Sequence, residues 1–401
     1  MNKYFIVGSL LFGLLRFSGG VGISVAQELR TGDKRVKISR LPELVVFEKD
    51  GRKEGVSAAF GGTLGDAIVV AGGCNFPNVP AADGGKKVYY DQIYVLRHPE
   101  QKRAKWELAG KLPVSAANGA SVTLPEGIVC IGGCHQKGAL SGVWLLQWNA
   151  DGSAIVSRSL SELPVAMDNF AAATDGKRIF VAGGNIDGKP GKRSFVLDSL
   201  DAPMWQELPV VPGPMRLQPS AVVVKGKFYL LGGFLPRLGG QECMIATDGL
   251  VYDPVYGGWK ETGAILPEGE IVPRALVGAS GVVLRDSIVV FQGGVHREVF
   301  KAAVDNPLLQ RRAAGLGQRE ELERLRSEQA AYMRHEPGWY KFNRQLLLFR
   351  PEEGRWTALG DWEEVARAGA LLLVYKDKLV VVNGETKPGI RSAGVYMIDM
   401  N

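Results

Sequence analysis

The chain has 401 residues, of which 46% are hydrophobic and 22% charged, with a formal net charge of +6 at pH 7. These values are typical of a globular protein and exclude a disordered or fibrous chain. The basic residues form no dense stripe of the kind that nucleic-acid binding requires, so we expect no nucleic-acid partner. A mild positive charge suits a small anionic ligand.

The first 26 residues have the features of a secretory signal peptide. Lys3 supplies a positive charge, segment 5–15 is apolar, and the tripeptide 24–26 (SVA) forms a small-x-small cleavage site. Arg16 interrupts the apolar segment, which makes it too short to span a bilayer. An uncleaved anchor is the alternative. We therefore expect a secreted protein that leaves the membrane after cleavage.

A repeat runs through the rest of the chain. Its copies are spaced by about 50–60 residues, and the last step is near 90, a period typical of propellers and solenoids. Each copy reads as four strands, with small residues in the first and often a tryptophan near Leu-Pro in the fourth. The second strand is β-branched and ends in a glycine pair or its equivalent, at Gly73, Gly133, Gly184, Gly233, Gly294 and Glu385.

Four-stranded repeats arranged radially predict an all-β fold, a six-bladed β-propeller, with an unclosed β-sandwich as the alternative. We expect a single propeller over residues 27–401. The last repeat lacks a fourth strand, because only 393–398 follows Glu385. Segment 36–43 (VKISRLPE) resembles a fourth strand without a blade before it. We expect 36–43 to pair with 393–398 and complete the sixth blade, which would hide its edges.

Long connections follow the second strands of blades one, four and five, at 75–91, 234–247 and 295–343. The last contains an insertion at about 296–340. Its stretch 318–333 (QREELERLRSEQAAYM) favours a helix. The helix would be either a lid or partner-facing arm, or a solvated helix packed on the rim.

Glu385 interrupts the repeat, because the sequence aligns it with the second glycine of the pair. In an up-and-down blade, the starts of first strands and the ends of second strands share one face, so we expect a functional mouth there. Its expected substrate-binding residues are the polar residues that open the inner strands: Asn118, Asn169, Arg216, Arg274 and Arg367.

The segment from Glu385 to Arg391 (ETKPGIR) carries the chemistry. Its Pro-Gly pair would turn the loop so that Arg391 returns toward the mouth. A glutamate can take and return a proton, and an arginine can bind a carboxylate with two hydrogen bonds. A purely structural ion pair is the alternative.

At this segment the chain resembles the Kelch-type bacterial sialic acid mutarotases, also called N-acetylneuraminate epimerases. The resemblance covers almost the whole mature chain and is most specific at 383–396 (NGETKPGIRSAGVY), 293–300 (GGVHREVF) and 341–356 (KFNRQLLLFRPEEGRW), with a looser match at 72–96. It implies Kelch-type repeats, a periplasmic location and activity tied to Glu385 and Arg391. The blades occur in cyclically permuted order, with the Lys86-Lys87 blade first, which a closed ring tolerates.

The resemblance implies an isomerase that interconverts the anomers of N-acetylneuraminate or a related sugar acid. Glu385 would transfer the proton, Arg391 would anchor the carboxylate, and His296, Arg297, Lys86 and Lys87 would add polar contacts or a second proton donor. This chemistry requires no metal or organic cofactor. A non-catalytic Kelch propeller that binds a carbohydrate or protein is one alternative. A copper-radical oxidase is another, but it needs clustered Tyr and His ligands, and the four histidines are dispersed.

The four cysteines do not form a disulfide framework on spacing alone. Cys130 and Cys134 bracket Ile-Gly-Gly, and only His135 lies beside them, which does not match the usual zinc-ligand spacing. Buried thiols and a single bridge between neighbouring blades both remain open.

Overall fold

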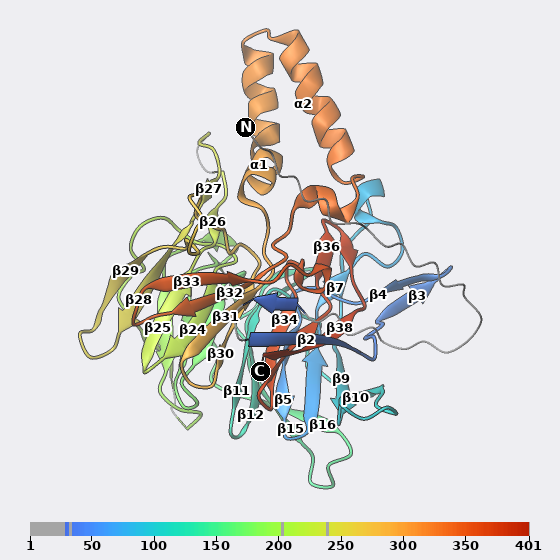
Figure 1. Cartoon of the computed structure of the whole chain (residues 1–401), viewed down its shortest axis with the longest axis vertical. Helices are drawn as coiled ribbons and strands as arrows, with labels where there is room; N and C mark the ends of the chain where they lie inside the picture. Colours follow the sequence, from blue (N-terminus) through green and yellow to red (C-terminus); the bar gives the residue numbers. More distant parts are fainter. Residues whose placement is uncertain (1–28, 32–33, 202–203, 238–239, 401) are drawn as a thin grey trace, which may run out of the picture.

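The computed structural model describes residues 29–31, 34–201, 204–237 and 240–400. The predicted signal peptide lies outside them. Within the described residues the chain forms six four-stranded blades, one of them extended by a short fifth strand, and a helical hairpin that rises from one face (Figure 1). The prediction of a six-bladed, all-β propeller with a helical insertion is confirmed.

Each blade is an antiparallel sheet that runs outward from the axis. Blade one consists of β5 (Phe60–Leu64), β6 (Ala67–Ala71), β9 (Gln92–Arg97) and β10 (Trp106–Lys111). Blade two consists of β11 (Ala120–Leu124), β12 (Gly127–Ile131), β15 (Val143–Trp148) and β16 (Ile155–Ser159). Blade three consists of β18 (Ala171–Thr174), β19 (Ile179–Ala182), β22 (Ser194–Leu197) and β23 (Gln206–Glu207). Blade four consists of β24 (Ser220–Val224), β25 (Lys227–Leu231), β28 (Asp248–Asp253) and β29 (Gly258–Ala264). Blade five consists of β30 (Ser280–Leu284), β31 (Ile288–Gln292), β32 (Leu346–Arg350) and β33 (Arg355–Leu359). Blade six consists of β34 (Leu371–Tyr375), β35 (Lys378–Val382), β38 (Val395–Met400), β2 (Lys34–Leu41) and the short fifth strand β1 (Leu29–Thr31).

The N-terminal strand completes the last blade, as the sequence predicts. β2 pairs with β38 from Val36 opposite Met400 to Leu41 opposite Val395. The carbonyl of Pro42, directly after β2, accepts a hydrogen bond of 2.9 Å from the indole of Trp106 in blade one. The indole of Trp259 binds the carbonyl of Pro209 in the same way between blades three and four. The Leu-Pro end of a fourth strand therefore accepts a hydrogen bond from a tryptophan of the next blade, and the N-terminal segment makes the same contact.

The core lies between the blades. Six clusters of buried apolar side chains fill the six interfaces between neighbouring blades, including the one between blade six and blade one. That last cluster contains Leu41, Ile68 and Val380, all at most 8% exposed. Because each sheet is apolar on both faces, it is stable only between two neighbours, and only a closed ring gives every blade two neighbours.

A ring of six backbone hydrogen bonds surrounds the axis, and we call its members the axial collar. Each collar residue precedes an inner strand, and its N–H donates to the carbonyl of the collar residue one blade earlier, at 2.7–3.2 Å. All six have φ between +50° and +68°. In chain order they are Ala58, Asn118, Asn169, Gln218, Gly278 and Gly369. Asn118 and Asn169, expected at the mouth, therefore belong to the collar.

Connections on one face carry short hairpins that begin directly after the glycine pairs. The elements of this face are β7 (Cys74–Asn75), η1 (Ala81–Asp83), β8 (Val88–Tyr89), β13 (Cys134–His135), β14 (Gly138–Ala139), β17 (Met167–Asp168), β20 (Asn185–Ile186), β21 (Lys189–Pro190), β26 (Phe234–Leu235), β27 (Met244–Ile245), η3 (Glu363–Val365), β36 (Glu385–Lys387) and β37 (Ile390–Arg391). A further hairpin, β3 (Phe47–Lys49) and β4 (Arg52–Glu54), precedes blade one.

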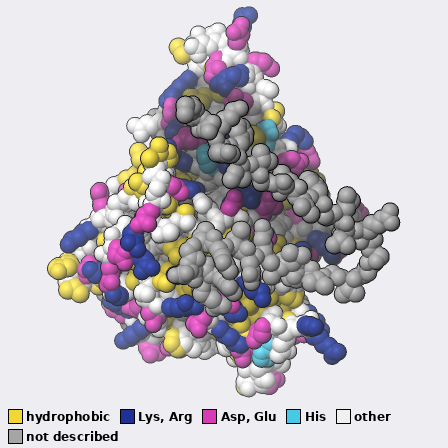
Figure 2. Space-filling model, viewed as in Figure 1, with side chains coloured by type: hydrophobic (Ala, Val, Ile, Leu, Met, Phe, Trp, Pro, Cys, Tyr) yellow, Lys and Arg dark blue, Asp and Glu magenta, His cyan; other side chains and the backbone are white. Residues whose placement is uncertain are grey.

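In blade five this connection is the helical insertion. It consists of α1 (Arg297–Gly315), α2 (Arg319–Tyr332) and η2 (Pro337–Tyr340). The helix expected over 318–333 is confirmed as α2, whereas α1 was not foreseen. Side chains of both charge signs cover the projecting end of the hairpin (Figure 2). Among the described helices, none combines the length and the apolar character needed to cross a membrane.

The closure by β2 can be tested with a buried and an exposed residue of the same strand. Val36 is 1% exposed in the cluster between blades five and six, whereas Lys37 is exposed. Val36→Asn buries an amide among apolar side chains, so we expect a loss of roughly 3 kcal/mol in the free energy of unfolding. Lys37→Asn should cost less than about 0.5 kcal/mol. Denaturant unfolding measures both, and equal effects would contradict the assigned closure.

Candidate active site

Glu385 follows the glycine pair of blade six, which corrects its alignment from the sequence. The left-handed backbone positions after β35 belong to Asn383 (φ +52°) and Gly384 (φ +87°), which match Gly232 and Gly233 in blade four. Asn383 takes the place of the first glycine because asparagine tolerates this conformation better than most side chains. Glu385 therefore does not replace the second glycine. Its counterparts in the other blades are Cys74, Cys134, Asn185, Phe234 and Val295.

Glu385 and Arg391 face each other across a tight hairpin. β36 and β37 pair them directly, with the Pro388-Gly389 turn between the strands and Gly389 at φ +84°. The Arg391 Nη2 lies 2.5 Å from the Glu385 Oε1. Arg391 thus returns to Glu385 as the sequence predicts, because a Pro-Gly pair supplies the fixed and the positive φ values of such a turn.

Arg391 is buried in a polar pocket beside blade one. Its Nε donates to the Ser57 Oγ at 3.0 Å, and its guanidinium lies 4.8 Å from the centroid of the Phe76 ring. Its side chain is 3% exposed, and its Nη1 has no hydrogen-bond partner among the described residues. A buried donor without a partner costs free energy, so Nη1 is an unsatisfied group of this pocket.

The Glu385 carboxylate opens into the mouth, with 24% of its side chain exposed. Burial raises its pKa above the ordinary value, and the charges of Arg391 and Lys87 oppose that rise. A carboxyl group whose pKa is moved upward exchanges protons more readily near neutral pH. The environment of Glu385 is therefore suited to acid–base chemistry.

The mouth leads into a cavity of about 270 Å³ on the axis, just inside the collar. Glu385 reaches it from blade six, and Asn118, Asn169 and Gln218 line it from blades two to four. The Gln218 Nε2 donates to the Asn169 Oδ1 at 3.1 Å, which connects these two amides. The structure brings Glu385 together with Asn118 and Asn169, as expected. These groups form a polar floor beside one carboxylate.

A second wall comes from the connections of blades one and two. The Asn118 Nδ2 donates to the Cys134 Sγ at 3.4 Å, and that sulfur lies 3.9 Å from the Tyr89 hydroxyl. Burial raises the pKa values of both Tyr89 and Cys134. Lys87 is near enough to lower the pKa values of Cys134 and Glu385 through its charge. Lys87 is thus the half-buried cation beside the carboxylate, whereas Lys86 is exposed.

Arg216 and Arg367 do not reach the cavity. They occupy equivalent positions in blades four and six and are 2% and 4% exposed. Each Nη1 donates at 2.9 Å to a carbonyl at the end of its own second strand, that of Gly232 or Asn383. Arg216 also pairs with Asp248 at 2.8 Å. These arginines stabilise the blades, because they satisfy carbonyls that the positive-φ turn leaves without partners.

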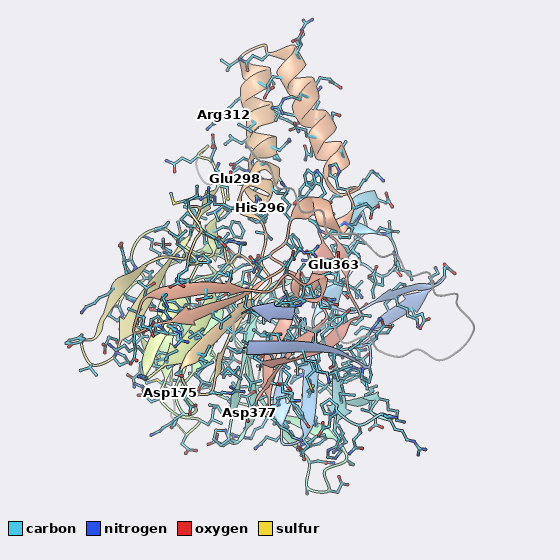
Figure 3. The ribbon with its side chains drawn as sticks, viewed as in Figure 1. Asp175, His296, Glu298, Arg312, Glu363 and Asp377 are labelled. Atoms are coloured by element: carbon cyan, nitrogen blue, oxygen red, sulfur yellow. The ribbon has the colours of Figure 1, made fainter. Side chains whose placement is uncertain are left out.

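The remaining expected residues lie at the base of the helical hairpin. Figure 3 shows His296 there and places Asp175 and Asp377 on the opposite face. The His296 Nδ1 accepts from the Val299 N–H and caps α1. Burial, Lys341 and Arg274 all contribute to lowering the His296 pKa. Arg274 pairs with Glu270 and binds Gln345, and Arg297 pairs with its neighbour Glu298.

Sequence analysis missed several residues of the mouth. Gln218 belongs to the collar at the position of Asn118 and Asn169. In blade four the sequence instead led us to predict Arg216, two residues earlier, as the substrate-binding residue. Counting back from each glycine pair would have identified Gln218, because the separation is nearly constant. Ser57 and Tyr89 carry no such signal, since their roles depend on contacts between distant segments.

All four cysteines are free thiols. Of the two possibilities left open by their spacing, the structure therefore has thiols and not a bridge. Within the described ranges, no group of three or more His, Cys, Asp or Glu side chains is arranged to hold a metal ion.

A family comparison identifies the protein class to which this fold and mouth belong. The model of the N-acetylneuraminate epimerase family matches residues 17–155 and 160–401. The chain belongs to this family. The match includes the hairpin of Glu385 and Arg391 and all six blades except most of β16.

Relatives of the same name support the assignment at lower coverage. The chain is 32% identical over 241 residues to the N-acetylneuraminate epimerase of Haemophilus influenzae (strain PittEE), covering 60% of this chain and 59% of that one. It is 27% identical over 237 residues to the enzyme of that name from Yersinia enterocolitica, covering 59% and 56%. The matched part thus spans less than two thirds of these relatives.

A solved structure shows the same fold. The structure titled "Structure of YjhT" aligns with a TM-score of 0.58 and 15% sequence identity, covering 90% of this chain and 99% of that one. At this identity the likeness concerns the fold alone. The cyclic permutation of blades expected from the sequence stays a prediction.

The mouth of this epimerase-family chain can be probed through its cysteines. Cys134 is half-buried, whereas Cys74, Cys130 and Cys243 are buried. We expect iodoacetamide to modify Cys134 first in the native protein. The reaction should be slow at pH 8 and faster at higher pH, because burial raises the pKa of this thiol. Peptide mass spectrometry identifies the site, with Cys134→Ser as the control. Preferential modification of Cys74 would contradict the geometry.

Proposed function

We propose that this protein is a mutarotase that accelerates the interconversion of the anomers of N-acetylneuraminate or a closely related sugar acid. The observation that carries the proposal is the ion pair of Glu385 with Arg391 at the mouth of a propeller of the N-acetylneuraminate epimerase family. The relatives that share the name match over three fifths of the chain or less, so the activity is proposed from the site and the family together.

The reaction opens the hemiketal ring and closes it on the other face. Opening breaks the bond between the anomeric carbon and the ring oxygen. The anomeric hydroxyl loses a proton and the ring oxygen gains one. The Glu385 carboxylate takes the first proton, and its raised pKa makes it an effective base at neutral pH. After rotation of the open-chain ketone, the same proton returns to the carbonyl oxygen as the ring closes.

The positive charge at the mouth suits the carboxylate of the sugar acid. Arg391 Nη1 is an unpartnered donor beside Glu385, and Lys87 is the half-buried cation of the opposite wall. A carboxylate bound by Arg391 places the adjacent anomeric carbon next to Glu385. Hydrogen bonds from Asn118, Asn169 and Gln218 would orient the hydroxyl and acetamido groups.

Secretion to the periplasm through residues 1–26 is part of the proposal. It rests on the signal-like sequence, because those residues lie outside the described part of the chain. The site as proposed needs no metal or organic cofactor. A non-catalytic sugar-binding propeller would show the same affinity without acceleration of anomer exchange.

Glu385→Gln tests the base. The amide keeps the shape of the side chain but cannot accept the proton, so we expect kcat to fall by about 10²–10⁴-fold with KM nearly unchanged. NMR or polarimetry on freshly dissolved α-anomer measures the rate above the spontaneous one. Glu363→Gln is the matched control, because this carboxylate is exposed on the rim, with 83% of its side chain accessible (Figure 3).

Two outcomes of the Glu385→Gln experiment separate the possibilities. Undiminished exchange in a folded Gln variant would remove Glu385 from the mechanism and leave the Glu385–Arg391 pair a structural role. Absence of acceleration by the wild-type protein would overturn the mutarotase proposal itself and favour a binding function.

Arg391→Met tests the electrostatic part of the site. The Arg391 charge lowers the Glu385 pKa against the effect of burial, so its removal should raise that pKa further. Activity that needs the carboxylate is lost as pH falls through this pKa. We therefore expect the acidic limb of the kcat/KM profile to move to higher pH, with an increase in KM. Arg178→Met is the control, because it pairs with Asp175 on the opposite face. An unmoved acidic limb would contradict the assignment.

A further inference from the structure

The end of α2 is fixed against the hairpin that carries Glu385. Lys387 Nζ donates to the His335 carbonyl at 2.8 Å, which joins β36 to the segment after α2. A side chain at Gly389 would come within 3.1 Å of the Met333 methyl group and 2.6 Å of the Ala81 side chain. The tip of the hairpin is therefore held between the helical insertion and the connection of blade one. The insertion is part of the mouth and not only a decoration of the rim.

An aromatic cluster sets the position of Tyr332, the last residue of α2. Tyr340 is 1% exposed, and its hydroxyl donates to the Tyr332 carbonyl. The Tyr332 ring meets Tyr340 and Trp339 edge-on, with centroids 5.4 Å and 6.0 Å apart. His335 stacks on Trp339 at 4.0 Å. Because neighbours fix both its backbone and its ring, the Tyr332 side chain is preorganised.

Tyr332 and Glu385 line the same cavity. This second space, of about 330 Å³, lies between the insertion and the propeller and also contacts His296 and Phe342. It shares Glu385 and Gln218 with the axial cavity, so Glu385 lines both spaces. Within the described ranges, the Tyr332 hydroxyl has no hydrogen-bond partner from the protein. The Tyr332 side chain thus lines the same space as Glu385, with a hydroxyl that no described protein group binds.

The protonation of Tyr332 is linked to that of Glu385. Burial, with smaller contributions from Tyr340 and Glu385, raises the pKa of Tyr332 to about 12. The phenol therefore keeps its proton at neutral pH and is a donor. When Glu385 takes a proton, its negative charge disappears, and the cost of forming a phenolate nearby falls. Proton uptake by Glu385 and proton loss from Tyr332 thus favour each other.

We propose that Tyr332 is the second proton-transfer residue of the reaction and donates to the ring oxygen of the sugar acid while Glu385 takes the anomeric proton. The inference rests on the mutarotase function proposed above. As the carbon–oxygen bond of the ring breaks, its electron pair goes to the ring oxygen, which takes the Tyr332 proton. The anomeric oxygen gives its proton to Glu385 and becomes the ketone oxygen. On closure the Tyr332 phenolate takes the proton back from the hydroxyl, and Glu385 returns the other.

The other candidate donors are less suited to this step. His296 uses Nδ1 to cap α1, and its lowered pKa keeps the imidazole neutral, which makes it a weak acid. Lys87 faces Glu385 from the connection of blade one, where its charge suits the carboxylate of the ligand. Tyr332 approaches from the insertion side and leaves the ligand between two proton-transfer groups.

The test is Tyr332→Phe. The phenylalanine ring keeps the contacts with Tyr340 and Trp339, and the lost hydroxyl has no protein partner, so the melting temperature should stay within a few degrees. We expect kcat for anomer exchange to fall by about 10²–10⁴-fold while KM changes by less than about threefold. Tyr256→Phe is the control, because Tyr256 is 74% exposed on the β28–β29 turn. It should behave as wild type.

The outcomes distinguish this inference from the function on which it rests. If the wild type accelerates exchange, Glu385→Gln is impaired and Tyr332→Phe keeps its kcat, only the role of Tyr332 is overturned. A rise in KM with unchanged kcat also overturns it, since the hydroxyl would then only bind the sugar. If the wild type itself gives no acceleration, the proposed function fails first.

Discussion

The axial collar is the constraint on which the rest of the structure depends. Six residues with positive φ are joined by backbone hydrogen bonds, each to the collar residue of the neighbouring blade. The bond between Ala58 and Gly369 closes the ring. Backbone N–H and C=O groups need hydrogen-bond partners wherever the chain packs closely, as it does around the axis. The collar supplies those partners and also fixes the radius at which each inner strand begins. The ends of the second strands, and therefore the glycine pairs, then come to one face.

The hairpin of Glu385 and Arg391 occupies a position that every blade offers. The residue after each glycine pair begins a connection on the mouth face, and blade six places a carboxylate there with its own arginine six positions later. A buried ion pair is weak evidence for stability, because desolvation offsets much of the attraction between the charges. Its location at the mouth, beside an unpartnered Arg391 donor, is better explained by chemistry than by folding.

The helical insertion shows how a repeat fold gains an individual site. The collar and glycine pairs are nearly the same in all blades, so they do not by themselves make one side of the mouth different from another. Blade five replaces the short hairpin of the other blades with α1 and α2, which rise from the face that carries the mouth (Figure 1). The insertion brings an aromatic cluster and Tyr332 to a space that Glu385 also lines. The asymmetry of the proposed site thus comes from loops on a nearly symmetric frame.

The sequence alone determined the repeat number, the closure by residues 36–43 and the return of Arg391 to Glu385, because strand periodicity and turn chemistry are local properties. It did not foresee α1, whose internal Pro307 argues against a helix. Tertiary contacts support that helix: the Asp305 carboxylate accepts from the Cys243 N–H at 2.7 Å, and Asn306 binds the Leu325 carbonyl at 3.0 Å.

Tertiary structure also decided which polar residues face the mouth. Arg216 and Gln218 differ by two positions, yet one is buried in its blade and the other lines the cavity, since the collar turn reverses the direction of the chain between them. Tyr332 lies more than fifty residues before Glu385, and no local pattern joins them. Only the packing of the insertion on the hairpin tip brings the phenol and the carboxylate to one space.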